Sequence, residues 1–237
     1  MLDSLFHGID VTRYVPHAIT KYQSKSNFIS EHLIAMNQTH SSTVAYVGVN
    51  NRNVIAEALL IENGRLKGYG LDVQHAGDHI NALPISDLQR ANSIDCDAVI
   101  TASSNLLLSV KAADCLPVFI MGGDLIAVIH AGRVGTIKKI TEQVCKIFKL
   151  KNIQNISIWF GPSACVCCYE IDRETRSHFD MLYENIAQIR SVYDDQNIQF
   201  LTQRNQPYCT QCDCNYFYSY RNGDLIKRNI FYLKKSN

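Results

Sequence analysis

The sequence predicts a single α+β domain built around a mixed β-sheet, and three observations lead to this prediction. Short runs of β-branched and aliphatic residues at 97–101, 105–110 and 125–130 are bounded by Gly, Ser or Asp, as expected of buried strands. Residues 135–150 place apolar side chains on one face and lysines on the other, which predicts an amphipathic helix. Strands and helices alternate only in part, which favours a mixed sheet over a strictly parallel one.

The composition is that of an ordinary globular protein. The 237 residues are 46% hydrophobic and 19% charged, with a net charge of +1, so the overall charge gives no reason to expect a nucleic-acid or acidic-membrane partner. The first residues carry an acid at position 3 and lack the apolar core of a signal peptide, and no apolar stretch reaches the length of a membrane span. We therefore expect a cytoplasmic protein with neither a nucleic-acid nor a membrane partner; the oligomeric state is left open.

Weaker patterns predict the remaining elements. Asn63-Gly64 between extended runs is a strong hairpin signal. Further segments predict strands at 44–49, 156–160, 198–202 and 216–220, and a second helix at 172–186.

Unusual residues lie at the ends of the central strands. Asp114-Cys115-Leu-Pro117 puts a carboxylate, a thiol and a proline in one tight passage, and the strand that ends at His130 is followed by Gly132. A Cys and a His at neighbouring strand ends are plausible ligands for a borderline-soft metal. The alternative is a core thiol with hydrogen-bonded histidines.

A third ligand has competing candidates. His40 lies just before the strand predicted at 44–49. His75 and His79 are four residues apart, the spacing of one helical face, but Gly77 and the surrounding acids favour a solvent-facing loop. His75 and His79 nevertheless compete with His40 for the position of the third ligand.

Several motifs occur in a specific order: NQTH at 37–40, DAVIT at 97–101, ADCLP at 113–117, HAG at 130–132, GPS at 161–163, CYE at 168–170 and FYSYR at 217–221. In this order the chain resembles the bacterial multicopper polyphenol oxidase, or laccase-domain, family. The resemblance implies one four-layer α/β/β/α domain over residues 1–237 with mixed sheets. The route through residues 50–94 is longer than the family's, so we expect an insertion there.

The resemblance also implies activity as a purine nucleoside phosphorylase, an adenosine deaminase, or both, and with it small-molecule substrates, namely a purine nucleoside and phosphate. His40, Cys115 and His130 would bind zinc and leave a fourth position open, as in catalytic zinc sites, where hydroxide forms near neutral pH. Asp114 would shuttle protons or orient a ligand. Copper is less favoured, because a multicopper oxidase needs several centres and many histidines.

Substrate contacts follow from basic positions. Arg221 and Arg228 match the family's C-terminal segment and would bind anionic or ribose groups. Arg133 is shifted by one position, because the family's His-Ala-Gly-Trp-Arg-Gly is replaced by His-Ala-Gly-Arg-Val-Gly at 130–135. The family's Thr-Gly-Arg is likewise replaced by Ile-Lys-Arg at 226–228. Two alternatives therefore stay open: amide hydrolysis on a peptidoglycan precursor, by the metal or by Cys168 as nucleophile, and a metal-binding protein without catalytic activity.

The nine cysteines are an odd number, so they cannot all form intramolecular disulfides. Cys96, Cys145 and Cys165 are expected to be small buried hydrophobic residues. Six cysteines gather in two segments, at 165, 167 and 168 and at 209, 212 and 214. Paired CxxC segments are typical of structural zinc sites, but the first segment is CxCC, so a second metal site and a lone reactive thiol are both open.

Overall fold

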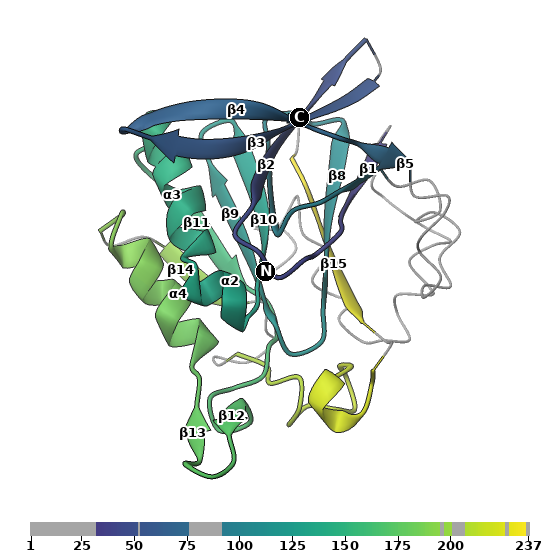
Figure 1. Ribbon diagram of the computed structural model, residues 1–237, viewed down its shortest axis with the longest axis vertical. Coiled ribbons are helices and arrows are strands. Elements are labelled where there is room, and N and C mark those ends of the chain that lie inside the picture. The colour runs from purple at the N-terminus through teal and green to yellow at the C-terminus, as the bar shows by residue number, and fades with distance from the viewer. Residues whose placement is uncertain are drawn as a thin grey trace.

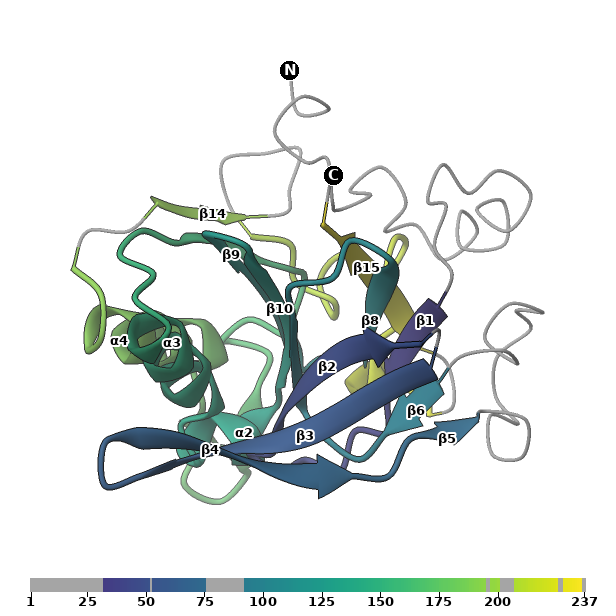
Figure 2. The same cartoon turned by 90° about the horizontal axis from the view of Figure 1, so that it is seen from above.

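Two β-sheets face each other, and helices cover the outer face of the larger sheet (Figures 1 and 2). The computed structural model describes residues 32–51, 53–75, 92–194, 197–200, 207–225 and 228–235. The result is a strand-rich mixed α/β domain with few helices, as the sequence predicts. Three of the four expected layers, helix, sheet and sheet, are formed by the described residues.

The larger sheet has eight strands and mixed pairing. Its order is β14 (Asn197–Phe200), β11 (Ser157–Phe160), β9 (Leu116–Gly122), β10 (Leu125–Ala131), β7 (Ala98–Thr101), β2 (Val44–Asn50), β3 (Asn53–Glu62) and β4 (Arg65–Leu71). β10 is antiparallel to β7 and β9, whereas β2 is parallel to β7. This mixture confirms the expectation drawn from the partial alternation of elements.

The smaller sheet has five strands in the order β15 (Asn229–Lys234), β8 (Leu106–Ala112), β1 (His32–Met36), β6 (Asn92–Ile94) and β5 (Gln74–His75). β1 is parallel to both β6 and β8. These three strands therefore end at the same edge, and from each of them the chain crosses to the larger sheet: β1 to β2, β6 to β7 and β8 to β9. The loops of the three crossovers meet at that edge.

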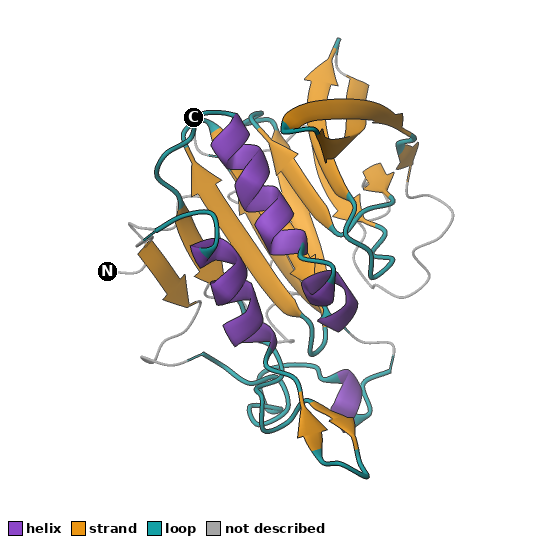
Figure 3. Ribbon diagram, turned by 60° about the vertical axis from the view of Figure 1, so that its left-hand side comes forward, coloured by secondary structure: helices purple, strands orange, loops and turns teal. Residues whose placement is uncertain are grey.

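The core has two parts, one on each face of β10. Ile126 and Val128 pack between the two sheets, whereas Ala127 and Ile129 pack beneath the helices. The helices are α2 (Arg133–Ile137), α3 (Ile140–Leu150) and α4 (Met181–Arg190), and Figure 3 shows α3 and α4 lying across the larger sheet. Because side chains alternate along a strand, His130 falls on the face of Ile126 and Val128, toward the smaller sheet.

Two of the helix predictions need correction. The helix predicted at 135–150 is split into α2 and α3, because Lys139 between them has a left-handed backbone with φ of 61°. The helix predicted at 172–186 is confirmed only in its second half. The Asp172 carboxylate accepts hydrogen bonds from the amides of Glu174 and Thr175, which stabilises a turn between β12 (Glu170–Asp172) and β13 (Ser177–His178). The helix begins instead at Asp180, whose side chain caps it by accepting from the Tyr183 amide.

The strand predicted at 216–220 is wrong. Turns and the short 3₁₀ helix η3 (Tyr220–Asn222) occupy that region. The Asn229 side chain bonds both the amide and the carbonyl of Tyr218, so a side chain satisfies the groups that a neighbouring strand would otherwise pair. Several strands have no counterpart among the predictions, including the longer strands β9 and β15 and the short strands β5, β6, β12 and β13.

The hairpin expected at Asn63-Gly64 joins β3 and β4, and both turn residues have positive φ, 51° and 71°, as a tight hairpin turn requires. It lengthens the larger sheet within the expected insertion at 50–94. His75 lies in β5, and His79 lies outside the described residues. No helix among the described residues combines the length and the apolar character that crossing a bilayer requires.

A buried side-chain amide of α4 connects the three helices. Asn185 of α4 is fully buried; it accepts a hydrogen bond from Thr141 of α3 and donates to Thr136 of α2. Replacing Asn185 by Leu keeps the branched shape of the side chain but removes the polar atoms that pair with these hydroxyls. We expect Asn185→Leu to lower the free energy of unfolding by about 1–3 kcal/mol in urea titrations. The adjacent exposed change Glu184→Leu should stay within about 0.5 kcal/mol of the parent, and equal effects of the two changes would contradict this role.

Candidate metal centre and its cavity

Three potential metal ligands meet where the crossovers converge. His40 comes from the β1–β2 crossover, Cys115 from the β8–β9 crossover and His130 from the end of β10. One ligand atom from each lies within 4.8 Å of the others, and the two imidazole rings are edge to face with centroids 5.0 Å apart. The three residues predicted as ligands are therefore brought together, with His40 as the histidine that completes the group.

A buried carboxylate orients His130. The Nδ1 atom of His130 lies 2.8 Å from Oδ1 of Asp97, and the side chains are only 3% and 0% exposed. A carboxylate at Nδ1 fixes the tautomer and leaves Nε2 as the nitrogen for a metal. Burial lowers the pKa of His130, although the Asp97 carboxylate partly opposes this shift. The imidazole is thus neutral near pH 7, the form that binds metals.

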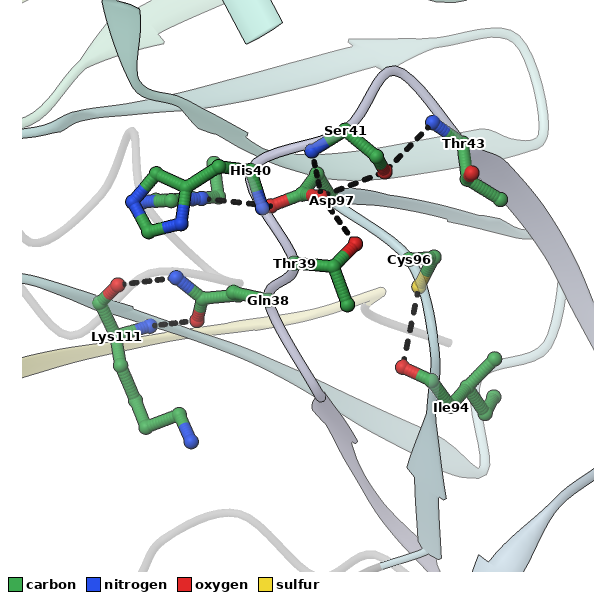
Figure 4. Close-up of polar contacts among 10 residues, drawn as sticks. Gln38, Thr39, His40, Ser41, Thr43, Ile94, Cys96, Asp97 and Lys111 are labelled. Carbon is green, nitrogen blue, oxygen red and sulfur yellow. Dashed lines mark hydrogen bonds and ion pairs between the residues drawn. The ribbon is translucent and has the colours of Figure 1, made fainter. Parts of the chain in front are cut away.

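The same carboxylate holds the loop that carries His40. Oδ2 of Asp97 accepts hydrogen bonds from the amide and hydroxyl of Ser41, at 2.6 and 2.7 Å, and Oδ1 accepts from the His40 amide at 3.2 Å (Figure 4). Burial alone would raise the pKa of Asp97, but the hydrogen bonds from His130 and Ser41 outweigh it and lower that pKa to about 2. Asp97 is therefore an anion at every physiological pH.

The His40 loop is also tied to β8. The Gln38 side chain donates to the carbonyl of Lys111 at 2.6 Å and accepts from its amide at 2.9 Å (Figure 4). His40 itself has φ of 55°, a left-handed conformation that costs energy for a residue with a side chain. The paired contacts of Gln38 and Asp97 hold the loop in this shape from both sides.

The space between the ligands fits a metal ion. A Cβ on Gly132 would lie 2.9 Å from the sulfur of Cys115 and 3.3 and 3.6 Å from the rings of His40 and His130. The lack of a side chain at Gly132 therefore permits the close approach of the backbone to the three ligands. Burial raises the pKa of the Cys115 thiol to about 12 without a metal, so a metal would bind with release of that proton. Two nitrogens and one sulfur suit a borderline-soft cation.

Asp114 is engaged in hydrogen bonds with the C-terminal loops. One oxygen accepts from the Thr210 hydroxyl at 2.7 Å and the other from the Arg221 amide at 2.9 Å. Its φ of 88° forms the turn that lets this carboxylate and the neighbouring thiol of Cys115 both point inward. Both carboxylate oxygens of Asp114 are thus engaged with the C-terminal loops, and neither of these hydrogen bonds reaches His40, Cys115 or His130.

The ligand group forms part of the wall of a cavity of about 1260 Å³. Four basic residues and two carboxylates line the same space: Lys111, Arg173, Arg221, Arg228, Asp114 and Glu170. Burial and the positive charge of Arg228 lower the pKa of Lys111. The excess of cations beside the ligand group makes the cavity attractive to an anion.

Two of the predicted substrate contacts line this cavity, and the third does not. Arg221 stacks over the ring of Tyr169 at 4.1 Å, and Arg228 donates to the carbonyl of Leu225 at 3.1 Å. Arg133 lies exposed at the start of α2 and is not among the lining residues. The charge of Arg133 still acts on Tyr169. Burial raises the pKa of Tyr169, and the charges of Arg221 and Arg133 oppose this rise.

Cys168 lies at the cavity wall within a group of four cysteines. Its sulfur is 3.4 Å from that of Cys212, and the sulfurs of Cys165, Cys168, Cys209 and Cys212 all lie within 4.8 Å of one another. Burial and its neighbouring thiols raise the pKa of Cys168, the opposite of what an activated nucleophile needs. Cys96 and Cys145 are buried as expected, whereas Cys165 is half-buried in this group.

Sequence reasoning did not single out Asp97, Lys111 or Glu170, which the structure places at the ligand group or in the cavity lining. Asp97 was predicted only as the first residue of a strand, and its place directly before a buried apolar run was the available signal. Glu170 was noted only within the Cys-Tyr-Glu motif. Lys111 ends an apolar strand, and nothing in its local sequence distinguishes it from a solvated lysine.

Comparison with known proteins gives a consistent family match. A family model described as multi-copper polyphenol oxidoreductase laccase matches residues 2–228. A purine nucleoside phosphorylase of Aquifex aeolicus is 35% identical over 86 residues, covering 36% of this chain and 42% of the relative. A purine nucleoside phosphorylase of Rickettsia conorii is 30% identical over 156 residues, covering 65% and 56%.

An adenosine deaminase from an unknown prokaryotic organism is 30% identical over 118 residues, covering 47% of this chain and 44% of the relative. The chain thus matches about half the length of these curated relatives. Among solved structures, YlmD from Geobacillus stearothermophilus has a TM-score of 0.67 and covers 96% of this chain and 82% of its own. YfiH from Bacillus licheniformis has a TM-score of 0.64, and the match covers 93% of this chain and 80% of YfiH. Each of the two structures is 17% identical to this chain in sequence. This likeness shows the fold.

The role of Asp97 can be tested through metal affinity. Asp97→Asn keeps the shape of the side chain but removes the charge that holds His130 and the His40 loop. We expect the zinc dissociation constant of the ligand group, measured by competition with a chelator, to rise about 10–100-fold. Asp95→Asn makes the same change two residues away at an exposed side chain bonded to Asn37, and should leave the affinity unchanged. An unchanged affinity in Asp97→Asn would rule out the orienting role.

Proposed function

This chain belongs to the multi-copper polyphenol oxidoreductase laccase family, and we propose that it is a zinc-dependent enzyme that cleaves purine nucleosides by phosphorolysis. One observation carries the proposal: a group of three metal ligands forms the wall of a cavity whose lining is rich in cations. Two relatives named purine nucleoside phosphorylase support the choice of substrate. The activity and substrate of the whole protein rest on this proposal.

His40, Cys115 and His130 would hold the metal, and the three-ligand set leaves a fourth position for water or substrate. When bound, zinc would supply Lewis acidity and lower the pKa of a water molecule. The same His2Cys set also occurs in mononuclear copper sites, so the metal has to be identified by elemental analysis. Asp97 would keep His130 in its ligand tautomer, and Gly132 would keep the space between the ligands open.

The cations of the cavity would bind inorganic phosphate. In phosphorolysis a phosphate oxygen forms a bond to the anomeric carbon of the ribose while the bond to the purine nitrogen breaks, and the departing purine takes up a proton. Lys111 and Arg228 lie close enough for the arginine to lower the pKa of the lysine, as expected of two cations that share an anion. Glu170, the other carboxylate of the lining, is the candidate donor of the proton.

Hydrolytic deamination of adenosine is a second candidate, favoured by the open ligand position and by the relative named adenosine deaminase. Water would add at C6, and the amino group would leave as ammonia after taking up a proton, giving inosine. This reaction needs a carboxylic acid that passes protons without binding the metal. Both oxygens of Asp114 are bonded to the C-terminal loops, so we assign this role to Glu170.

The two reactions are separated by their products. Adenosine is incubated with the metal-replete protein with and without phosphate, and the products are resolved by chromatography. We expect free adenine and ribose 1-phosphate only when phosphate is present, and the loss of both in Cys115→Ser. Inosine formed without phosphate would favour deamination instead. The exposed change Cys214→Ser is the matched control for the substitution itself.

If neither product exceeds the Cys115→Ser background, the purine proposal fails. Amide substrates of the cell-wall-precursor type are then the next class to test, with the same variants. Bound metal without turnover on either class would favour a metal-binding protein without catalytic activity.

Phosphate recognition can be tested at Arg228. Arg228→Gln removes one charge from the cavity and leaves a shorter polar side chain. We expect the KM for phosphate to rise about tenfold or more, as for the loss of one charge-assisted hydrogen bond, and the KM for adenosine to change much less. Arg65→Gln, at an exposed residue of β4 outside the lining, is the control. Equal rises in both KM values would argue against a phosphate contact.

A further inference from the structure

We propose that Cys165, Cys168, Cys209 and Cys212 bind a second metal ion, a structural zinc in a four-thiolate site separate from the His40, Cys115 and His130 group. The sulfurs of these four residues lie within 4.8 Å of one another. A zinc–sulfur distance of about 2.3 Å in a tetrahedron places the sulfurs about 3.8 Å apart, so a small contraction would complete the site. The proposal does not depend on the nucleoside chemistry.

The fold selects four of the six clustered cysteines as two CxxC pairs. The first pair is Cys165 and Cys168 and the second is Cys209 and Cys212, whereas Cys167 and Cys214 are exposed and outside the group. The sequence run Cys-Val-Cys-Cys thus contains a CxxC pair with an extra cysteine inside it. Two such pairs brought together from distant segments are typical of structural zinc sites.

The backbone around the group has the form of metal-binding turns. The amides of Cys168 and Tyr169 both donate to the Cys165 carbonyl at 2.9 Å, which folds the first pair into a tight turn. The sulfur of Cys209 accepts hydrogen bonds from the amides of Cys165, at 3.3 Å, and Cys212, at 3.4 Å. Amides that point at a sulfur stabilise the negative charge of a thiolate.

The spacing of the sulfurs favours one metal ion. Four thiolates around a single tetrahedral ion lie close together, whereas the iron and sulfide atoms of a cluster hold its cysteines further apart. No position remains open when all four ligands are thiolates, so the site would be structural.

Such an ion would hold the wall of the cavity in place. The first pair lies in the segment after β11 and the second in the segment before β15, joined by a parallel bridge between Ser163 and Cys209. Tyr169 directly follows Cys168, and its ring carries the guanidinium of Arg221 at 4.1 Å. The ion would therefore connect the two segments whose stacked pair lines the cavity.

The test measures metal content in matched variants. Protein reconstituted with zinc under reducing conditions is desalted and analysed for metal and for thiols. We expect Cys212→Ser to lose about one zinc per chain relative to the parent, and Cys214→Ser, two residues away and exposed, to lose none. Cys115→Ser should lose the other zinc and keep this one, which separates a failure here from a failure of the nucleoside proposal.

Cobalt substitution adds a spectroscopic readout of the ligand set, because a folding defect cannot produce the spectrum of a four-sulfur site. Cobalt in Cys115→Ser should give the strong thiolate-to-metal absorption of a tetrahedral four-sulfur site, and cobalt in Cys212→Ser should not. The proposal is overturned if the parent and Cys212→Ser bind equal amounts of metal. It is also overturned if the reconstituted protein contains a disulfide between Cys168 and Cys212. The same holds if the thiols of Cys165, Cys168, Cys209 and Cys212 are all free of metal.

Discussion

The buried carboxylate of Asp97 is the contact on which the rest of the site depends. It lies in the β6–β7 crossover, is fully buried, and binds His130 from β10 together with the loop that carries His40. A buried charge is costly unless hydrogen bonds replace its hydration, and Asp97 receives them from both neighbours. Two of the three candidate ligands are thus fixed by one group, and their geometry is set by the protein itself.

Topology explains why these residues meet. β1, β6 and β8 run parallel and end at one edge of the smaller sheet. Their crossovers lead to β2, β7 and β9 of the larger sheet, where β7 and β9 flank β10 and β2 pairs with β7. Each crossover contributes one polar group to the same point: His40, Asp97 and Cys115. Positions 40, 97 and 115 are far apart in the chain, so the site exists only when both sheets have formed and packed. Metal binding is accordingly coupled to the completeness of the fold.

The sequence predicted the parts of this structure that have local causes. The strands near 98–101 and 125–131, the β3–β4 hairpin and the amphipathic face of α3 follow from periodicity and turn chemistry. β9 was missed because Pro117 interrupts the pattern expected of a central strand. The prediction at 216–220 failed because a distant side chain, Asn229, replaces strand pairing there. The ligand positions were predicted from motifs, whereas Asp97 gains its role only from the crossover geometry.

Cys168 shows how the two cysteine-bearing sites constrain the chemistry. It lines the cavity beside Tyr169, the position a nucleophile would need, yet its sulfur is directed at Cys212. A sulfur committed to a metal in a closed four-thiolate site cannot also attack an amide carbon. The four-thiolate site and the cysteine-nucleophile mechanism therefore exclude each other. If the cysteines bind zinc, chemistry in this cavity has to proceed at the open group of His40, Cys115 and His130. The altered segment at 130–135 then matters less for substrate binding, because Arg133 lies outside the cavity lining. The positive charge of the lining comes instead from four other residues: Lys111, Arg173, Arg221 and Arg228.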